Sequence, residues 1–223
     1  MNSPHASADA ISDPAHQRLV QLMQRLVVQG VNRGASGNSS VRYGRGMLIT
    51  PSALLPDALT PDTLVEVAMD GGYNNPLKPS SEWRIHRDIY AARPDINAIV
   101  HTHSTHAVTL ACLRRDLPPF HYMIAMAGGR DVRCSGYATF GTEALSRTAL
   151  TALEDRMACL LANHGLLACG RDLAQAETLA VEIEHLCEAY LKACSIGEPV
   201  LLSDADIDEV LARFDAYRRG QLD

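Results

Sequence analysis

Apolar positions along the 223-residue chain recur at two different spacings, which predict alternating helices and strands. Over 19–27 they return every three or four residues, as on one face of a helix. Ser12-Asp13-Pro14 before this stripe is a helix start signal, and Gly30 after it is a typical stop. Further helices are expected after Pro79-Ser80-Ser81-Glu82, over about 104–114, from about 142 to 153, over about 173–196, and from 203 onward.

Strands are expected where short apolar or β-branched runs stand between turn residues. Segments 40–43 and 47–50 flank a Gly-Arg-Gly turn, and the runs 97–100, 159–163 and 166–169 are short and mostly apolar. This alternation of strands and helices predicts a single α/β domain over 12–223, with helices covering a central sheet. Residues 1–11 are polar and rich in Ala and Ser, so a disordered tail is expected there.

Composition and charge argue against several classes of protein. Hydrophobic residues make up 47% of the chain and charged residues 21%, which is ordinary for a soluble globular protein. The formal net charge is −6 and no basic stripe is present, so no nucleic-acid partner is expected. No apolar run reaches membrane-spanning length and no signal-peptide pattern occurs, so we expect a cytoplasmic protein without a membrane partner. The six cysteines form no Cys-x-x-Cys pair, and buried, reduced thiols are expected.

The strongest chemical signal is His101-Thr102-His103, followed farther along by Asn163-His164-Gly165. Side chains alternate along a strand, so His101 and His103 are expected on the same face where a strand ends. His164, at the end of a second strand, would complete a three-nitrogen site. Three protein ligands with an open fourth position are typical of a catalytic zinc. A His-x-His pair alone, in a chain with nine histidines, more often has no metal.

Residues at the start of the helix near position 80 carry a second signal. Glu82 lies in the expected first turn, where a glutamate more often faces solvent and complements the helix dipole. The alternative is a carboxylate aimed at the metal, as ligand or general base. Ser80 and Ser81 cap the same helix, and hydroxyls with free backbone N–H groups at a helix N-terminus can hold a phosphate. The loop 34–40 exposes more N–H groups for the same anion, although its two glycines also suit an ordinary turn.

Other histidines and a neighbouring tyrosine carry weaker signals. His106 is expected to cap or pack, and His86 and His121 have no spacing that favours a ligand role. Tyr122 alone is interpreted as a half-buried packing residue.

Several motifs, in order along residues 19–217, together resemble the class II aldolase/adducin family. The matching stretches are Gly37-Asn38-Ser39-Ser40-Val41-Arg42-Tyr43, Gly46-Met47-Leu48-Ile49-Thr50-Pro51, Pro79-Ser80-Ser81-Glu82-Trp83-Arg84, His101-Thr102-His103, His121-Tyr122-Met123-Ile124-Ala125, Gly136-Tyr137-Ala138-Thr139-Phe140-Gly141-Thr142 and His164-Gly165-Leu166. A series of motifs in this order is far more specific than any one of them.

This resemblance implies an α/β/α three-layer sandwich with a central, mostly antiparallel sheet, assembled as a fourfold-symmetric homotetramer. It implies one Zn²⁺, or another divalent metal, per subunit. Glu82 is the implied fourth ligand, and it becomes the base when substrate binds. Tyr122 is the implied proton donor from the neighbouring subunit, and Tyr217 is placed near the aldehyde. The implied metal ligands besides Glu82 are His101, His103 and His164.

The family's phosphate site also has counterparts in this chain. The implied phosphate-binding residues are Gly37, Asn38, Ser52, Ala53, Ser80 and Ser81. Two positions depart from the family pattern, with Ala35 in place of a threonine and Ala53 in place of a glycine. Hydroxyls of Ser36 or Ser52 are available to offset the loss at Ala35.

The implied activity is reversible cleavage of a ketose 1-phosphate, L-fuculose 1-phosphate or a close analogue, to dihydroxyacetone phosphate and a small aldehyde. A zinc would polarise the ketone, a carboxylate would remove a proton in the synthesis direction, and a phenol would donate one to the aldehyde oxygen. Alternatives are an aldolase for 5-deoxyribulose or methylthioribulose 1-phosphate, an L-ribulose-5-phosphate 4-epimerase, and a decarboxylase or dehydratase. A non-catalytic adducin-like module is disfavoured because all three histidines and Glu82 are present.

Overall fold

A seven-stranded sheet with the order β3-β2-β1-β4-β7-β6-β5 lies at the centre of the computed structural model, which describes residues 13–219 and 221. The tail predicted over 1–11 falls outside the described residues. Neighbouring strands are antiparallel, except that β5 and β6 are parallel. The predicted mostly antiparallel sheet is therefore confirmed. The strands are β1 (Asn38–Tyr43), β2 (Gly46–Ile49), β3 (Val65–Ala68), β4 (Ala98–Thr102), β5 (Arg133–Cys134), β6 (Ala158–Leu161) and β7 (Gly165–Gly170).

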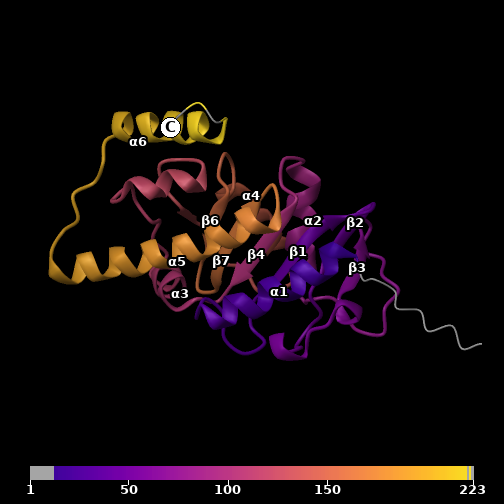
Figure 1. Ribbon diagram of the computed structural model, residues 1–223. Coiled ribbons are helices and arrows are strands. Elements are labelled where there is room, and N and C mark those ends of the chain that lie inside the picture. Colours follow the sequence, from indigo (N-terminus) through magenta and orange to yellow (C-terminus); the bar gives the residue numbers. More distant parts are fainter. Residues whose placement is uncertain (1–12, 220, 222–223) are drawn as a thin grey trace, which may run out of the picture.

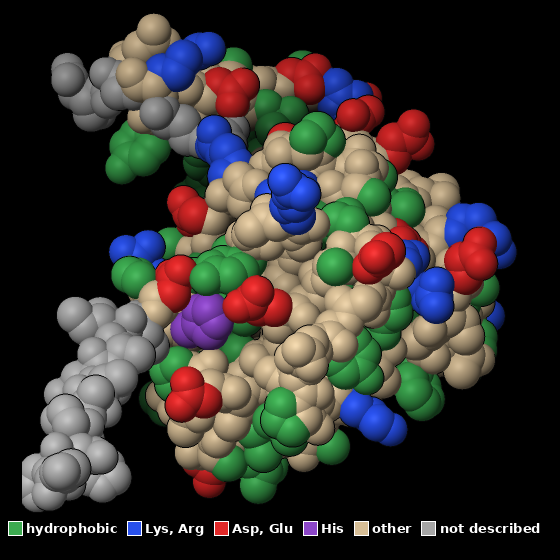
Figure 2. Space-filling model, turned by 90° about the vertical axis from the view of Figure 1, so that its right-hand side faces the viewer, with side chains coloured by type: hydrophobic (Ala, Val, Ile, Leu, Met, Phe, Trp, Pro, Cys, Tyr) green, Lys and Arg blue, Asp and Glu red, His purple; other side chains and the backbone are tan. Residues whose placement is uncertain are grey.

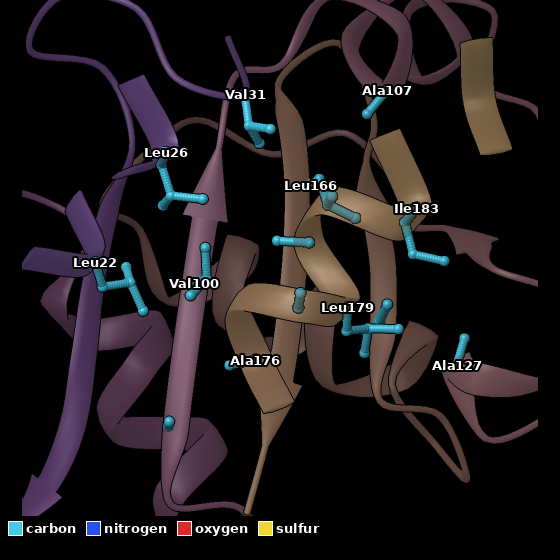
Figure 3. Close-up of a cluster of buried hydrophobic side chains, with 14 of the residues drawn as sticks. Leu22, Leu26, Val31, Val100, Ala107, Ala127, Leu166, Ala176, Leu179 and Ile183 are labelled. Atoms are coloured by element: carbon cyan, nitrogen blue, oxygen red, sulfur yellow. The ribbon is translucent and has the colours of Figure 1, made fainter. Parts of the chain in front are cut away.

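Helices cover both faces of this sheet, which confirms the three-layer sandwich (Figure 1). On one face lie α1 (Pro14–Val28), α3 (Thr105–Cys112) and α5 (Leu173–Ile196), and on the other lie α2 (Trp83–Ala92) and α4 (Glu143–Ala152). Each face has its own cluster of buried apolar side chains. Figure 3 shows one cluster, where Leu22 and Leu26 of α1 and Leu179 of α5 pack over strands that carry Val100 and Leu166.

The first helix illustrates how local sequence sets an element. Asp13 is the N-cap, and its carboxylate accepts a hydrogen bond from the backbone N–H of Ala15 at 2.8 Å. Pro14 occupies the first helical position, where its missing N–H costs nothing. Most of the apolar stripe beyond it, including Leu19 and Leu22, is buried, whereas Val27 at its end is 39% exposed. The predicted start and buried face of this helix are both observed.

Several short elements were not expected. Strand β5 has two residues, too few to show an alternation, whereas β3 has four residues that alternate between buried and exposed, a short signal that sequence reasoning missed. Three short 3₁₀-helices also occur, η1 (Pro56–Ala58), η2 (Pro61–Thr63) and η3 (Tyr122–Ala127). The cysteine prediction was wrong for Cys112 and Cys194, which are exposed although they lie on helices with apolar neighbours.

The last helix, α6 (Asp204–Arg218), lies beyond the three layers and packs against η3 (Figure 1). Arg130, just after η3, holds its N-terminus through ion pairs of 3.1 Å to Asp204 and 2.7 Å to Asp208. Acidic and basic side chains are interspersed on the face shown in Figure 2. Among the residues that the structure describes, none of the helices combines the length and apolarity that crossing a membrane requires.

Candidate metal centre and substrate pocket

Three imidazoles and one carboxylate meet at the end of the sheet where β4 ends. His101 lies within β4 and His103 one residue beyond it, while His164 comes from the loop between β6 and β7. The rings form an edge-on triangle with centroids 4.8–4.9 Å apart. Together with Glu82, they offer ligand atoms that all lie within 4.8 Å of one another. The structure thus brings all four residues of the predicted metal site together.

A tight turn explains how His164 reaches this position. Asn163, just before it, has φ 55°, a left-handed conformation that asparagine tolerates better than most residues. Gly165, just after it, begins β7 where that strand touches β4. A Cβ at Gly165 would overlap the carbonyl oxygen of Thr102 and lie 3.1 Å from ring carbons of both His101 and His103. Glycine is therefore required for the two strands and the imidazoles to approach this closely.

The hydrogen bonding of His101 leaves its other ring nitrogen able to bind a cation. Its Nδ1 lies 2.9 Å from the carbonyl oxygen of Leu166. A carbonyl can only accept, so Nδ1 carries the proton and Nε2 of the neutral ring has a lone pair. That Nε2 faces Glu82 Oε2 at 3.0 Å and His103 Nε2 at 3.0 Å. Lone pairs and a carboxylate converging on one point repel one another unless a proton or a metal cation lies between them.

The contacts of Glu82 also suit the binding of a cation. It is the N-cap residue of α2, yet its side chain makes no capping hydrogen bond. Its Oε1 is buried without a hydrogen-bond partner, although His164 Nε2 is only 3.2 Å away. The distance is short but the angles do not suit a hydrogen bond, so we regard the contact as two ligand atoms facing a common point. Two ligands of a tetrahedral zinc lie roughly 3.3 Å apart at bond lengths of about 2.0–2.1 Å. The residues present therefore fit a metal ion.

The electrostatics of the group keep Glu82, His103 and His164 in ligand-competent forms. Burial alone would raise the pKa of Glu82, but His101, His164 and an Asn38 hydrogen bond outweigh it and lower that pKa, so the carboxylate is ionised. Burial and repulsion from the other imidazoles lower the pKa of His103 to about 4 and also lower that of His164. Burial opposes charge on His101 as well, but Glu82 raises its pKa. Neutral imidazoles and an ionised carboxylate are the forms that bind metal.

A cavity of about 330 Å³ opens directly onto this group. Glu82, His103 and His164 line it, while His101 is buried beneath with 1% of its surface exposed. The six residues predicted to bind phosphate also line it, although they come from three separate segments. They are Gly37, Asn38, Ser52, Ala53, Ser80 and Ser81.

Two departures from the family pattern lie in the same cavity. Ala35 lines it beside Ser36, whose hydroxyl donates to the carbonyl of Arg33 at 2.6 Å. Ala53 has φ 59°, the left-handed region that favours glycine. An alanine in this conformation costs roughly 1–2 kcal/mol of backbone strain, which explains why a glycine suits the position.

Neither predicted tyrosine is among the described residues that line this cavity. Tyr122 begins η3 and is 49% exposed. Tyr217 lies on α6, is 71% exposed, and lines a different cavity together with Met126 and Phe214. Within one chain, the structure does not bring these two residues to the metal group.

Sequence reasoning missed a buried chain of polar side chains that leads away from Glu82. Asn38 Nδ2 donates to Glu82 Oε2 at 3.0 Å, and Asn38 Oδ1 lies 2.6 Å from His86 Nε2. The chain continues from His86 Nδ1 to the Ser40 hydroxyl at 2.7 Å and from there to the Tyr90 hydroxyl at 2.8 Å. Burial lowers the pKa of His86 to about 3 and raises that of Tyr90, so both are neutral.

A sequence signal for this chain did exist. Glu82, His86 and Tyr90 are four residues apart, which places them on one face of a helix, and Asn38 and Ser40 share one face of a strand. The expectation for His86 concerned only a ligand role, and its place in this polar chain is a different role.

Comparisons with known proteins agree with the geometry and confirm the resemblance. The model of the family described as "Class II Aldolase and Adducin N-terminal domain" matches residues 17–191. The chain is similar to a 5-methylthioribulose-1-phosphate/5-deoxyribulose-1-phosphate aldolase of Rhodospirillum rubrum, with 50% identity over 199 residues, 89% of this chain and 90% of that protein. It is 46% identical over 189 residues to L-fuculose phosphate aldolase of Escherichia coli, covering 84% and 88% of the two chains.

A solved structure titled L-fuculose 1-phosphate aldolase has the same fold. It superposes with a TM-score of 0.89 at 40% identity and covers 92% of this chain and 97% of its own.

Proposed function

We propose, since this chain belongs to the class II aldolase/adducin family, that it is a metal-dependent aldolase acting on a ketose 1-phosphate. It would cleave the bond between C3 and C4 reversibly, releasing dihydroxyacetone phosphate and a small aldehyde. The observation that carries this proposal is the Glu82, His101, His103 and His164 group open to a polar cavity. An adducin-like module without chemistry would not need a complete donor set at the mouth of a cavity.

Zinc is the metal we propose, at one ion per chain. Three imidazole nitrogens are a usual donor set for catalytic zinc, and displacement of the Glu82 carboxylate would leave the open fourth position. When bound, the ion would supply Lewis-acid polarisation of the ketone and its neighbouring hydroxyl.

Glu82 and Tyr122 would move the protons. In cleavage the C4 hydroxyl loses its proton, the C3–C4 electron pair stays with the dihydroxyacetone phosphate half, and C3 gains a proton. Glu82 lines the cavity and would carry the C3 proton, acting as the base in the synthesis direction. Tyr122 is half exposed and lies outside its own chain's cavity, so it would reach the cavity of a neighbouring subunit and exchange a proton with the aldehyde oxygen there. This requires a ring of subunits, for which we propose a fourfold homotetramer with Tyr217 also near the aldehyde.

The phosphate would bind at the end of the cavity formed by Ser80, Ser81 and the Gly37-Asn38 loop. Ser80 and Ser81 precede α2, so the positive end of that helix faces the cavity. Gly37 has φ 76°, and a Cβ at this position would lie 2.6 Å from the carbonyl oxygen of His101, so a side chain would clash. The loop thus packs directly against the strand of the metal ligands. The phosphate would supply binding energy that orients the reacting carbons.

The identity of the aldehyde is proposed from the aromatic side chains that line the cavity. Tyr137 and Phe140 line the cavity and are 57% and 63% exposed, so they form an apolar part of its rim. Cleavage of L-fuculose 1-phosphate leaves lactaldehyde, and its 5-deoxyribulose and 5-methylthioribulose counterparts leave acetaldehyde and methylthioacetaldehyde. All three aldehydes end in a methyl or methylthio group that an apolar rim would accept. We therefore propose L-fuculose 1-phosphate or one of these two analogues as the substrate.

A panel of phosphorylated ketoses tests this proposal. The zinc-loaded protein would be incubated with each of the three ketose 1-phosphates, with L-ribulose 5-phosphate, and with the dephosphorylated sugars, and dihydroxyacetone phosphate would be measured by coupled NADH oxidation. We expect release from at least one ketose 1-phosphate and little from its dephosphorylated form. Epimerisation of L-ribulose 5-phosphate without release from any ketose 1-phosphate would contradict the proposal.

A further inference from the structure

The buried polar chain from Tyr90 to Glu82 has a single direction, set by its two ends. Glu82 is ionised and can only accept, so the Asn38 atom facing it must be the amide nitrogen. The Asn38 oxygen then faces His86 and can only accept, so His86 Nε2 carries the proton. The neutral His86 must accept at Nδ1 from the Ser40 hydroxyl, which in turn accepts from the Tyr90 phenol. Every donor along the chain points toward Glu82.

Burying this polar chain costs folding free energy, so the chain is expected to have a role at the Glu82 carboxylate. All five residues are buried, with exposures from 0% at His86 and Ser40 to 7% at Glu82. Burying polar groups disfavours folding even when they are hydrogen-bonded to one another, compared with a well-packed apolar core. Asn38 alone would not define an orientation, because its amide could turn over and place its oxygen against Glu82. His86 removes that freedom, since it presents a proton to Asn38 from the other side.

We propose that Tyr90, Ser40 and His86 are positioning residues, which act through Asn38 to fix the orientation of the Glu82 carboxylate in the metal group. Helix α2 carries both Glu82 and His86, and strand β1 carries Asn38 directly beside His101 in the register of the sheet. The chain thus ties the carboxylate to the same strand pair that carries the imidazoles. Removing a partner that orients a ligating side chain typically lowers metal affinity or activity by about 10–100-fold.

The test compares three variants on α2. His86→Leu removes the proton donor, His86→Gln keeps an N–H at a similar reach, and Ile89→Val is a control that trims a buried side chain in the apolar cluster of the same helix. Zinc affinity is measured by competition with a chromophoric chelator. We expect His86→Leu to bind zinc about 10–100-fold more weakly, His86→Gln to restore most of the affinity, and Ile89→Val to match the wild type. The His86→Leu loss in turnover should appear in kcat with KM little changed.

Zinc affinity in His86→Leu equal to that of Ile89→Val would overturn the proposal, as would His86→Gln binding as weakly as His86→Leu. If His86→Leu does not fold, the ¹⁵N resonances of His86 in the wild type decide instead. A neutral ring with its proton on Nε2 from about pH 6 to about pH 8 supports the chain, and a proton on Nδ1 overturns it. Only the kcat measurement rests on the proposed function. The affinity and tautomer measurements need no substrate, so they remain decisive if the aldolase proposal fails.

Discussion

Gly165→Ala tests whether the close approach of β4 and β7 is what assembles the metal group. The added methyl would overlap the Thr102 carbonyl oxygen and lie 3.1 Å from His101 Cε1 and His103 Cδ2. Restoring an ordinary C···O contact of about 3.3–3.6 Å requires a shift on the order of 1 Å. The oxygen belongs to a strand backbone that pairs with β7, so the shift must move either β7 or the two imidazoles.

Such a shift has two consequences of different size. Overpacking of this kind costs roughly 1–3 kcal/mol of unfolding free energy, which lowers Tm by roughly 2–12 °C in a chain of this length. Metal–ligand distances tolerate only about 0.2 Å, so a shift of this size takes at least one imidazole out of bonding distance. We expect zinc affinity to fall at least as far as the roughly 10–100-fold that follows loss of a ligand-orienting partner.

Gly170→Ala is the matched control, because it makes the same change at the other end of β7. There the methyl would lie 2.6 Å from the Ala176 backbone nitrogen and 2.7 Å from the Asp172 carbonyl oxygen, away from the metal group. Thermal unfolding of the metal-free proteins and chelator competition would be recorded for both variants. Both should lose stability, and only Gly165→Ala should lose zinc affinity. Equal zinc affinity in the two variants would show that the close approach of β4 and β7 at Gly165 does not assemble the metal group.

Three further predictions concern the proposed chemistry. At saturating zinc, Glu82→Gln should still hold the ion through the three imidazoles, although at least as weakly as His86→Leu does, and should lose turnover by a factor on the order of 10²–10⁴. Near-normal kcat at saturating zinc would show that Glu82 is not the base. His103→Ala should lose zinc and activity together, as measured by metal analysis and product release, and full activity without bound metal would contradict this. Tyr122→Phe should fold and bind zinc normally yet cleave slowly. Mixing Tyr122→Phe with Glu82→Gln subunits should restore some activity, because a mixed ring can pair an intact Glu82 with an intact Tyr122 of the next chain. If mixed rings with demonstrated subunit exchange stay inactive, Tyr122 does not act across an interface.

The parts of the site that local patterns control were predictable from sequence. His101 and His103 are separated by one residue at a strand end, and a tight turn between two apolar runs presents His164. The serines and Glu82 precede a helix whose start signals are local. These features depend on neighbours in the chain, so alternation and capping rules locate them, although Glu82 proved to be the N-cap residue and not part of the first turn.

What could not be predicted depends on contacts between distant segments. The Asn38–Glu82 and Ser40–His86 hydrogen bonds join residues 44 and 46 positions apart, so they require the packing of α2 against β1. The four-residue spacing of Glu82, His86 and Tyr90 marks a polar helix face but does not say what that face meets. The roles of Tyr122 and Tyr217 stay predictions, because they depend on a second subunit.

Stepwise reconstitution of the metal-free protein with zinc decides whether this chain is a metal-dependent aldolase. Zinc would be added in known amounts, and dihydroxyacetone phosphate release from the best ketose 1-phosphate would be measured at each step. We expect no activity without metal, a linear rise of the rate with added zinc, and a plateau at one zinc per chain. Full activity in the metal-free protein, or zinc binding that leaves the rate of release unchanged, would contradict this expectation.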